Sequence, residues 1–108
     1  MSAAEAVAAA LRSTGLPFTH YAWPSGKAPE LPWCVWLEDG HGETFADDTD
    51  YAELPRMRVE LYQKNFDQQV LGSVRDALRE LGPTSERSQW VETEGCEMTA
   101  FEFTYTGE

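Results

Sequence analysis

The sequence has none of the short motifs that mark common catalytic centres. It contains no glycine-rich phosphate loop, no G-x-S-x-G, no H-E-x-x-H and no cysteine–histidine arrangement typical of a nucleophile. Asp47 and Asp48 are adjacent acids, but they lie in a polar segment without the dry setting that separates carboxylate pKa values. These absences predict that the protein is not an enzyme.

Cysteine and histidine are also scarce. Cys34 and Cys96 lie far apart without C-x-x-C spacing, and His20 and His41 are isolated, which excludes common zinc and redox motifs. We expect two reduced thiols in or beside the core. The acidic run from Asp39 has no glycine at the sixth position, which a calcium loop requires. The sequence therefore predicts neither a metal site nor a cofactor.

Basic residues are absent from two long segments. Residues 28–55 hold eight acidic side chains and residues 88–108 hold five, in a chain whose net charge is -11. Phosphate binding needs clustered Lys or Arg, so these segments are not expected to bind nucleic acid directly. Solubility together with self-repulsion against misassembly explains these acids as well as a functional role does.

Long apolar runs are missing as well. The alanine-rich N-terminus has no basic region and no extended hydrophobic stretch, so we expect neither a signal peptide nor a membrane span. A length of 108 residues suits one domain, spanning residues 1–108, with a single core. We expect a soluble protein made in the cytoplasm.

Residues 56–83 give the clearest structural pattern. Apolar residues alternate with polar ones over residues 57–62, as in a strand with one buried face. Apolar residues then recur at helical spacing from Val70 to Leu81. Asp67 is a suitable N-cap, and Gly82 followed by Pro83 predicts a left-handed stop at the other end. This stretch predicts a strand that leads directly into an amphipathic helix.

The remaining segments predict a second helix and four more strands. Ser2 and Glu5 form a capping-box pattern before a helix over residues 3–13, and Gly15 suits its C-terminal end. An acidic excursion over residues 39–54 separates the second and third strands, and Glu94-Gly95 suits a hairpin turn. The other strands are expected at residues 18–23, 32–38, 86–93 and 96–106. The fold class is therefore α+β, a mostly antiparallel sheet with two helices packed on one face, in the order α-β-β-(acidic loop)-β-α-β-β.

The strand expected at residues 32–38 carries apolar residues on both faces. Trp33, Val35 and Leu37 share one face, and Cys34 and Trp36 share the other, which is typical of a central strand or of one that contacts a partner. Aromatic side chains supply much contact area for little lost entropy, so Trp36 and Tyr51 are expected as exposed anchors. The expected subunit or partner interface is Trp36, Phe45, Asp47, Asp48, Asp50 and Tyr51.

The chain resembles the small tail-completion proteins encoded by long-tailed phages and prophages. The resemblance is carried by Leu31-Pro32-Trp33 opening a strand, by Val59-Glu60-Leu61-Tyr62 with Asp67 capping the next helix, and by the acidic final hairpin WVETEGCEMTAFEFTY. It implies a tail terminator or head-to-tail joining protein in the virion tail, present in the host cytoplasm during assembly. Such a protein would form a ring, with six-fold symmetry expected, between the tail tube protein and the head connector protein, and would need no membrane.

The resemblance supplies no catalytic residues. The placement of charge suggests a further hypothesis, that the base-free segments line the lumen, where DNA would pass without specific binding. Charge reversal at Asp47, Asp48 and Asp50 would test this. An alternative is an acidic inhibitor or nucleic-acid mimic that occupies the basic groove of a host enzyme. A small-ligand binding domain, suggested by the four tryptophans, is a third possibility.

Overall fold

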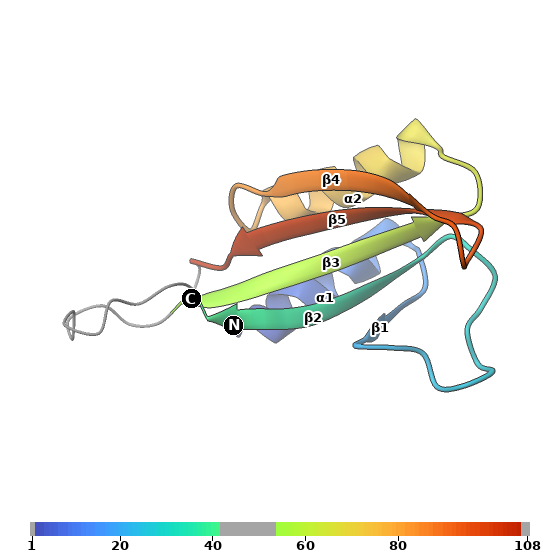
Figure 1. Ribbon diagram of the computed structural model, residues 1–108. Helices are drawn as coiled ribbons and strands as arrows, with labels where there is room; N and C mark the ends of the chain where they lie inside the picture. Colours follow the sequence, from blue (N-terminus) through green and yellow to red (C-terminus); the bar gives the residue numbers. More distant parts are fainter. Residues whose placement is uncertain (1, 42–53, 107–108) are drawn as a thin grey trace.

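The computed structural model describes residues 2–41 and 54–106. In this part of the chain, two helices and five strands follow one another in the order α-β-β-β-α-β-β (Figure 1). Their bounds are α1 Ala3–Thr14, β1 Phe18–His20, β2 Trp33–His41, β3 Pro55–Gln63, α2 Gln68–Arg79, β4 Ser85–Val91 and β5 Cys96–Thr104.

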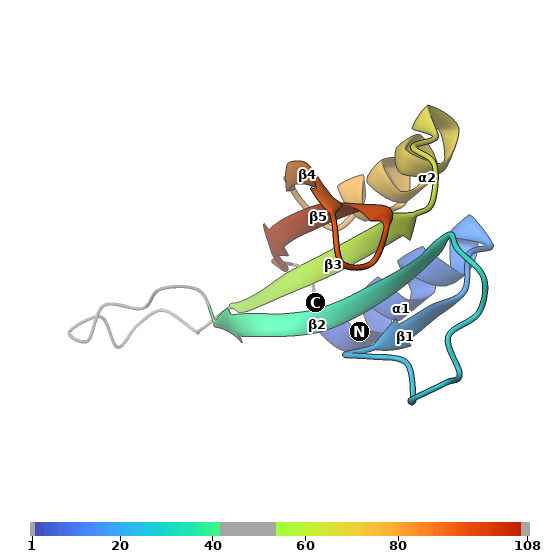
Figure 2. The same cartoon turned by 45° about the vertical axis from the view of Figure 1, so that its right-hand side comes forward.

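The strands form one sheet in the spatial order β1-β2-β3-β5-β4. Every neighbouring pair is antiparallel except β1 and β2, which run parallel because the chain crosses back over residues 21–32 before β2 begins. Both helices lie on the same side of the sheet in two views, with α1 behind β2 and β3 and α2 behind β5 and β4 (Figures 1 and 2). The predicted α+β class is confirmed.

The predicted strand-to-helix stretch forms β3 and α2. Asp67 is the N-cap, and its Oδ1 accepts from the N–H of Gln69 at 2.8 Å. Gln63, buried at the end of β3, accepts the N–H of Asp67 through its Oε1 and so fixes the start of the helix. The predicted stop at Gly82 is wrong, because α2 ends at Arg79 with Glu80 as a right-handed cap.

Helix α1 begins and ends as its sequence predicts. Ser2 accepts the N–H of Glu5, and the Glu5 carboxylate accepts the N–H of Ser2 at 2.9 Å, so the capping box is complete. Hydrogen bonding of the Glu5 carboxylate to the backbone N–H of Ser2, and secondly to the Ser2 side chain, lowers the pKa of Glu5. Gly15 then ends the helix in the left-handed conformation with φ 81°, which costs a glycine little.

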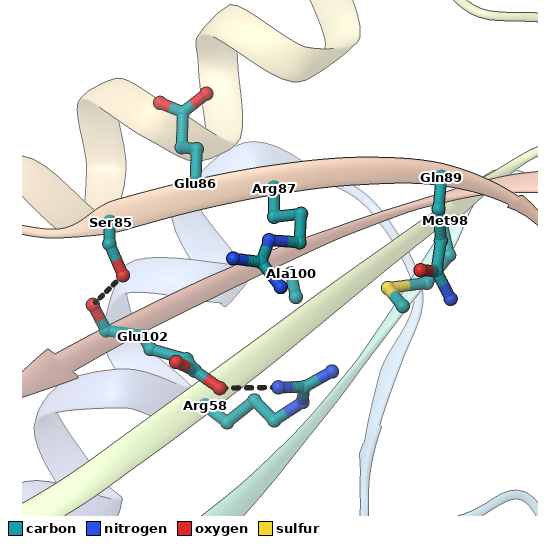
Figure 3. A pocket seen from close by; sticks show the side chains of 8 residues that line it. All are labelled: Arg58, Ser85, Glu86, Arg87, Gln89, Met98, Ala100 and Glu102. Carbon is teal, nitrogen blue, oxygen red and sulfur yellow. Dashed lines mark hydrogen bonds and ion pairs between the residues drawn. The ribbon is translucent and has the colours of Figure 1, made fainter.

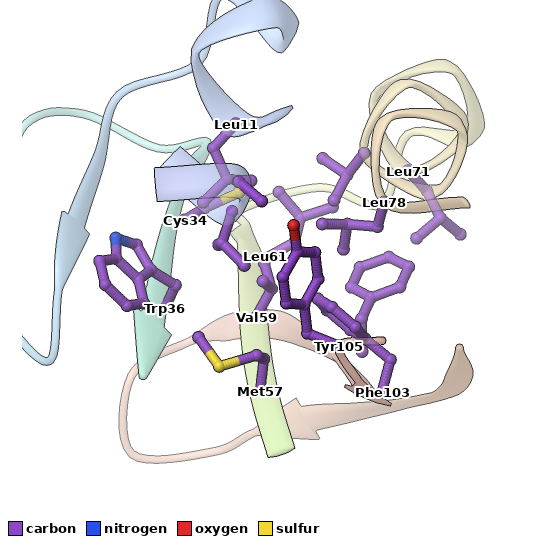
Figure 4. Packing of buried hydrophobic residues seen from close by; sticks show 14 residues of the cluster. Leu11, Cys34, Trp36, Met57, Val59, Leu61, Leu71, Leu78, Phe103 and Tyr105 are labelled. Carbon is purple, nitrogen blue, oxygen red and sulfur yellow. The ribbon is translucent and has the colours of Figure 1, made fainter. Parts of the chain in front are cut away.

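The core fills the space between the helices and the sheet (Figure 4). Alternation in the strands supplies one layer, and the apolar stripes of the two helices supply the other. Its buried members are Ala6, Val7, Leu11, Cys34, Trp36, Met57, Val59, Leu61, Leu71, Val74, Leu78, Phe101, Phe103 and Tyr105.

Three strand boundaries differ from the prediction. β1 is only three residues long, because Tyr21 turns the chain away from the sheet with a φ of 71°. β2 continues to His41, three residues beyond the predicted end. The last hairpin has a four-residue connection, residues 92–95, since β4 ends at Val91 and β5 starts at Cys96. The predicted acidic excursion lies largely outside the described residues.

Candidate functional site

One face of the sheet has no helix of the described chain packed on it, and we call it the uncovered face. Strand register places on it three residues from each of four strands. They are Trp33, Val35 and Leu37 of β2, Arg58, Glu60 and Tyr62 of β3, Met98, Ala100 and Glu102 of β5, and Ser85, Arg87 and Gln89 of β4.

Charged side chains cover the middle of the uncovered face. The Arg58 guanidinium donates from Nε to Glu60 at 2.7 Å and from Nη1 to Glu102 on the neighbouring strand. The Tyr62 hydroxyl donates to the other oxygen of Glu60 at 2.8 Å. Burial and the Glu60 carboxylate raise the pKa of this hydroxyl, so it stays a donor. These groups satisfy one another, which explains how Ala100 is only 7% exposed without a helix above it.

A hollow of about 250 Å³ opens beside this network. Figure 3 shows Ala100 on its floor, Glu102 bonded to Arg58 on one side, and Arg87 on the other. The Arg87 guanidinium has no ion pair among the described residues, whereas Glu86 points away toward α2 and accepts from Arg75 at 3.0 Å. The volume falls below the range usual for small-molecule sites, and the hollow brings no nucleophile and base together.

Residues 2–41 and 54–106 give little support for a metal site or a reactive thiol. No group of three His, Cys, Asp or Glu side chains there is placed to hold a metal ion. Both cysteines are free and buried, which confirms the sequence expectation. Burial raises the pKa of Cys34 to about 12, so its sulfur is a protonated thiol at neutral pH and a poor nucleophile.

Strand β4 forms one edge of the sheet. It pairs with β5 at seven successive positions without a register shift, and the described chain places no strand on its other side. Six of its seven residues are exposed, including Trp90 with 53% of its surface accessible. Lysine, proline and bulges, which commonly protect edge strands, are absent from residues 85–91. The unpaired N–H and C=O groups along β4 are therefore open to another strand.

The opposite edge is built differently. β1 covers β2 only at Cys34, Val35 and Trp36, and the N–H of Tyr21 donates to the carbonyl of Trp36 as the chain turns away. Beyond that point the open stretch of β2, residues 37–41, pairs with β3 at Leu37, Glu38 and His41, with a register shift between Glu38 and His41. No described strand lies on the other side of this stretch. Tyr21, 63% exposed, stands beside this open stretch.

A histidine–carboxylate pair lies at the same edge. His20 stacks on the Trp36 ring, with centroids 4.1 Å apart, and its Nε2 lies 2.9 Å from Glu38 Oε1. The hydrogen bond with His20 lowers the pKa of Glu38. The pair ties β1 to β2 and fixes where the open stretch begins.

The structure changes the predicted interface in one respect. Trp36 is wrong as an exposed anchor, because it is 8% exposed and belongs to the core between His20 and Val59. The other predicted interface positions are outside the described residues: Phe45, Asp47, Asp48, Asp50 and Tyr51. Sequence reasoning placed Trp36 by its apolar neighbours on both sides and did not foresee that α1 covers its face.

Sequence reasoning also missed both sheet edges. The signal for β4 was present, since SERSQWV has almost no apolar alternation and so predicts a strand with no buried face. The arginine network left a weaker signal, an opposite-charge pair at Arg58 and Glu60 on one face of β3. The shortness of β1 had no clear signal, because it depends on the turn at Tyr21.

A scan against known protein families matches none of them, and a search of curated proteins gives no significant match to this chain. No helix in the described ranges is long and apolar enough to cross a membrane.

Proposed function

We propose that this protein is a structural subunit of a phage or prophage tail, a tail terminator or head-to-tail joining protein. In this proposal, copies of the chain form a ring, with six-fold symmetry expected, at the head-proximal end of the tail tube. The ring stops growth of the tube and presents a surface to the head connector. The protein would therefore act in the virion tail after assembly in the host cytoplasm.

The observation that supports this proposal best is a sheet with two unlike open edges. One edge offers the whole of β4, and the other offers residues 37–41 of β2. Because the edges differ, contact between them is head-to-tail, and head-to-tail contacts generate rings or filaments rather than two-fold dimers. A subunit of this shape is suited to cyclic assembly.

The resemblance adds the tail context. The segment from Leu31 to Trp33 leads into β2, the strand with the open stretch at residues 37–41. Val59 to Tyr62 forms part of β3, where Glu60 and Tyr62 belong to the arginine network. These matching segments mainly supply strands of the sheet and the surface beside them. They therefore support a role that depends on surfaces between subunits.

The alternative, an acidic nucleic-acid mimic, has weaker support. A mimic must present unpaired carboxylates at phosphate-like spacing. In the described chain Glu60 and Glu102 bind Arg58, Glu86 binds Arg75, and Glu38 binds His20. Carboxylates already engaged in this way are poor substitutes for phosphates.

A tube-length assay tests the proposed function. Purified tail tube protein from the same structural gene module would be polymerised with and without this chain, and tube lengths would be measured by negative-stain electron microscopy. We expect short tubes capped at one end when the chain is present and long tubes when it is absent. Tubes of equal length, with no density at either end, would rule out the terminator role.

A further inference from the structure

We infer that β4 of one copy pairs in an antiparallel manner with residues 37–41 of β2 in the next copy, with Trp90 of the first packing against Tyr21 of the second. This interface rests on the self-association in the proposed function but requires nothing of the tail itself. It joins five-stranded sheets side by side and keeps the helices of successive copies on the same side.

Strand direction makes the pairing antiparallel. β2 is antiparallel to β3, β3 to β5, and β5 to β4, so β4 runs opposite to β2 within one subunit. Placing an identical subunit beside the first, with its helices on the same side, preserves these directions. The two open edges therefore meet in the antiparallel direction.

The antiparallel direction brings together the exposed aromatic residues of the two edges, Trp90 and Tyr21. In an antiparallel pair the Val91 end of β4 lies near Leu37 of the next copy, where β1 stops and Tyr21 turns away. Trp90 is 53% exposed and Tyr21 is 63% exposed in the single subunit. Contact between them would remove both large side chains from water, and aromatic residues of this kind commonly anchor interfaces.

Charge at the two edges is complementary. Arg87 of β4 and Asp39 of β2 are both exposed and have no ion pair among the described residues. Asp39 lies in the open stretch of β2, at the register shift between Glu38 and His41. A continued sheet brings these opposite charges to the same edge contact, whereas β4 paired with β4 of a second copy leaves Asp39 far from Arg87.

Cysteine cross-linking separates the possible pairings. Two exposed edge positions are changed in separate proteins, Gln89→Cys on β4 and Asp39→Cys on β2, and mild oxidation is applied to each protein alone and to their mixture. Cys34 and Cys96 are buried, so the unsubstituted protein is the control for background reaction. We expect a disulfide-linked dimer in the mixture only.

The other outcomes are informative. A dimer formed by Gln89→Cys alone would show that β4 pairs with itself and would overturn the inference. Association without any cross-link would overturn this interface while leaving ring formation intact. A chain that stays monomeric at all concentrations, both alone and with tail tube protein, would contradict the interface and the proposed function together.

Alanine substitutions provide the second readout. We expect Trp90→Ala and Tyr21→Ala each to weaken association at least tenfold while the thermal midpoint of the subunit changes little. Phe66→Ala is the matched control, because Phe66 is also exposed, at 47%, but lies in the β3–α2 connection away from both edges. Equal weakening by all three variants would contradict the assignment.

Discussion

Replacement of Arg58 by methionine tests how the uncovered face is stabilised. Methionine keeps most of the apolar stem beside Ala100 but removes the guanidinium that binds Glu60 and Glu102. The three side chains are 26%, 18% and 31% exposed, so water screens them only in part. Two carboxylates would remain close together without their shared cation.

The expected loss follows from these contacts. A hydrogen bond to a charged group contributes about 1.5–3 kcal/mol when well buried, and partial exposure reduces this, so we expect Arg58→Met to cost about 2 kcal/mol. For a domain near this size the thermal midpoint should fall by about 8 °C. A double-mutant cycle with Glu102→Gln should give a coupling energy of about 1 kcal/mol.

Urea unfolding measures the loss of stability and the coupling energy. It is carried out at a protein concentration where light scattering gives the same mass for every variant. Arg87→Met is the matched control, since Arg87 lies on the same face without an ion pair and should change stability by no more than about 0.5 kcal/mol. Equal losses for Arg58→Met and Arg87→Met, with a coupling energy near zero, would refute the stabilising role of the network.

Two further predictions concern single positions. Gly15→Ala should destabilise the protein by about 1 kcal/mol because Gly15 has a φ of 81°, whereas Gly72→Ala, inside α2 with open space around it, should stabilise it by about 0.5–1 kcal/mol; thermal melts giving the same sign for both would contradict this reasoning. In an NMR titration Glu38 should titrate below its ordinary value of 4.5, because the hydrogen bond with His20 lowers its pKa, and return toward that value in His20→Phe. The lowered pKa means that this small stability contribution is present above pH 4.5 and is lost as the pH falls through the folded-state pKa; an unchanged titration in His20→Phe would exclude His20 as the cause.

The elements set by local chemistry could be predicted from the sequence. Ser2, Glu5 and Gly15 determine the ends of α1, and Asp67 determines the start of α2, through hydrogen bonds within a few residues. Strand alternation also identified the buried face of β3, which carries Met57, Val59 and Leu61. Signals of this kind act over short distances, so a single sequence contains them.

The arrangement of the edges could not be predicted in the same way. That β4 lies outermost follows from β5 pairing with β3, a contact between distant segments such as Arg58 and Glu102. The burial of Trp36 depends on α1 packing over its face of the sheet, and the sequence of β2 alone does not contain this information. Helix α2 also ends at Arg79, before Gly82, where the sequence predicted its end. Tertiary packing decides such features, and local propensity does not.

The mass of the particle that the chain forms in solution tests the central claim most directly. Native mass spectrometry, alone and after addition of tail tube protein, would count the copies in units of 12.2 kDa. A closed assembly of one fixed copy number, six being expected, agrees with a ring built through unlike sheet edges. A monomer under both conditions, or a two-fold dimer that grows no further, would contradict it.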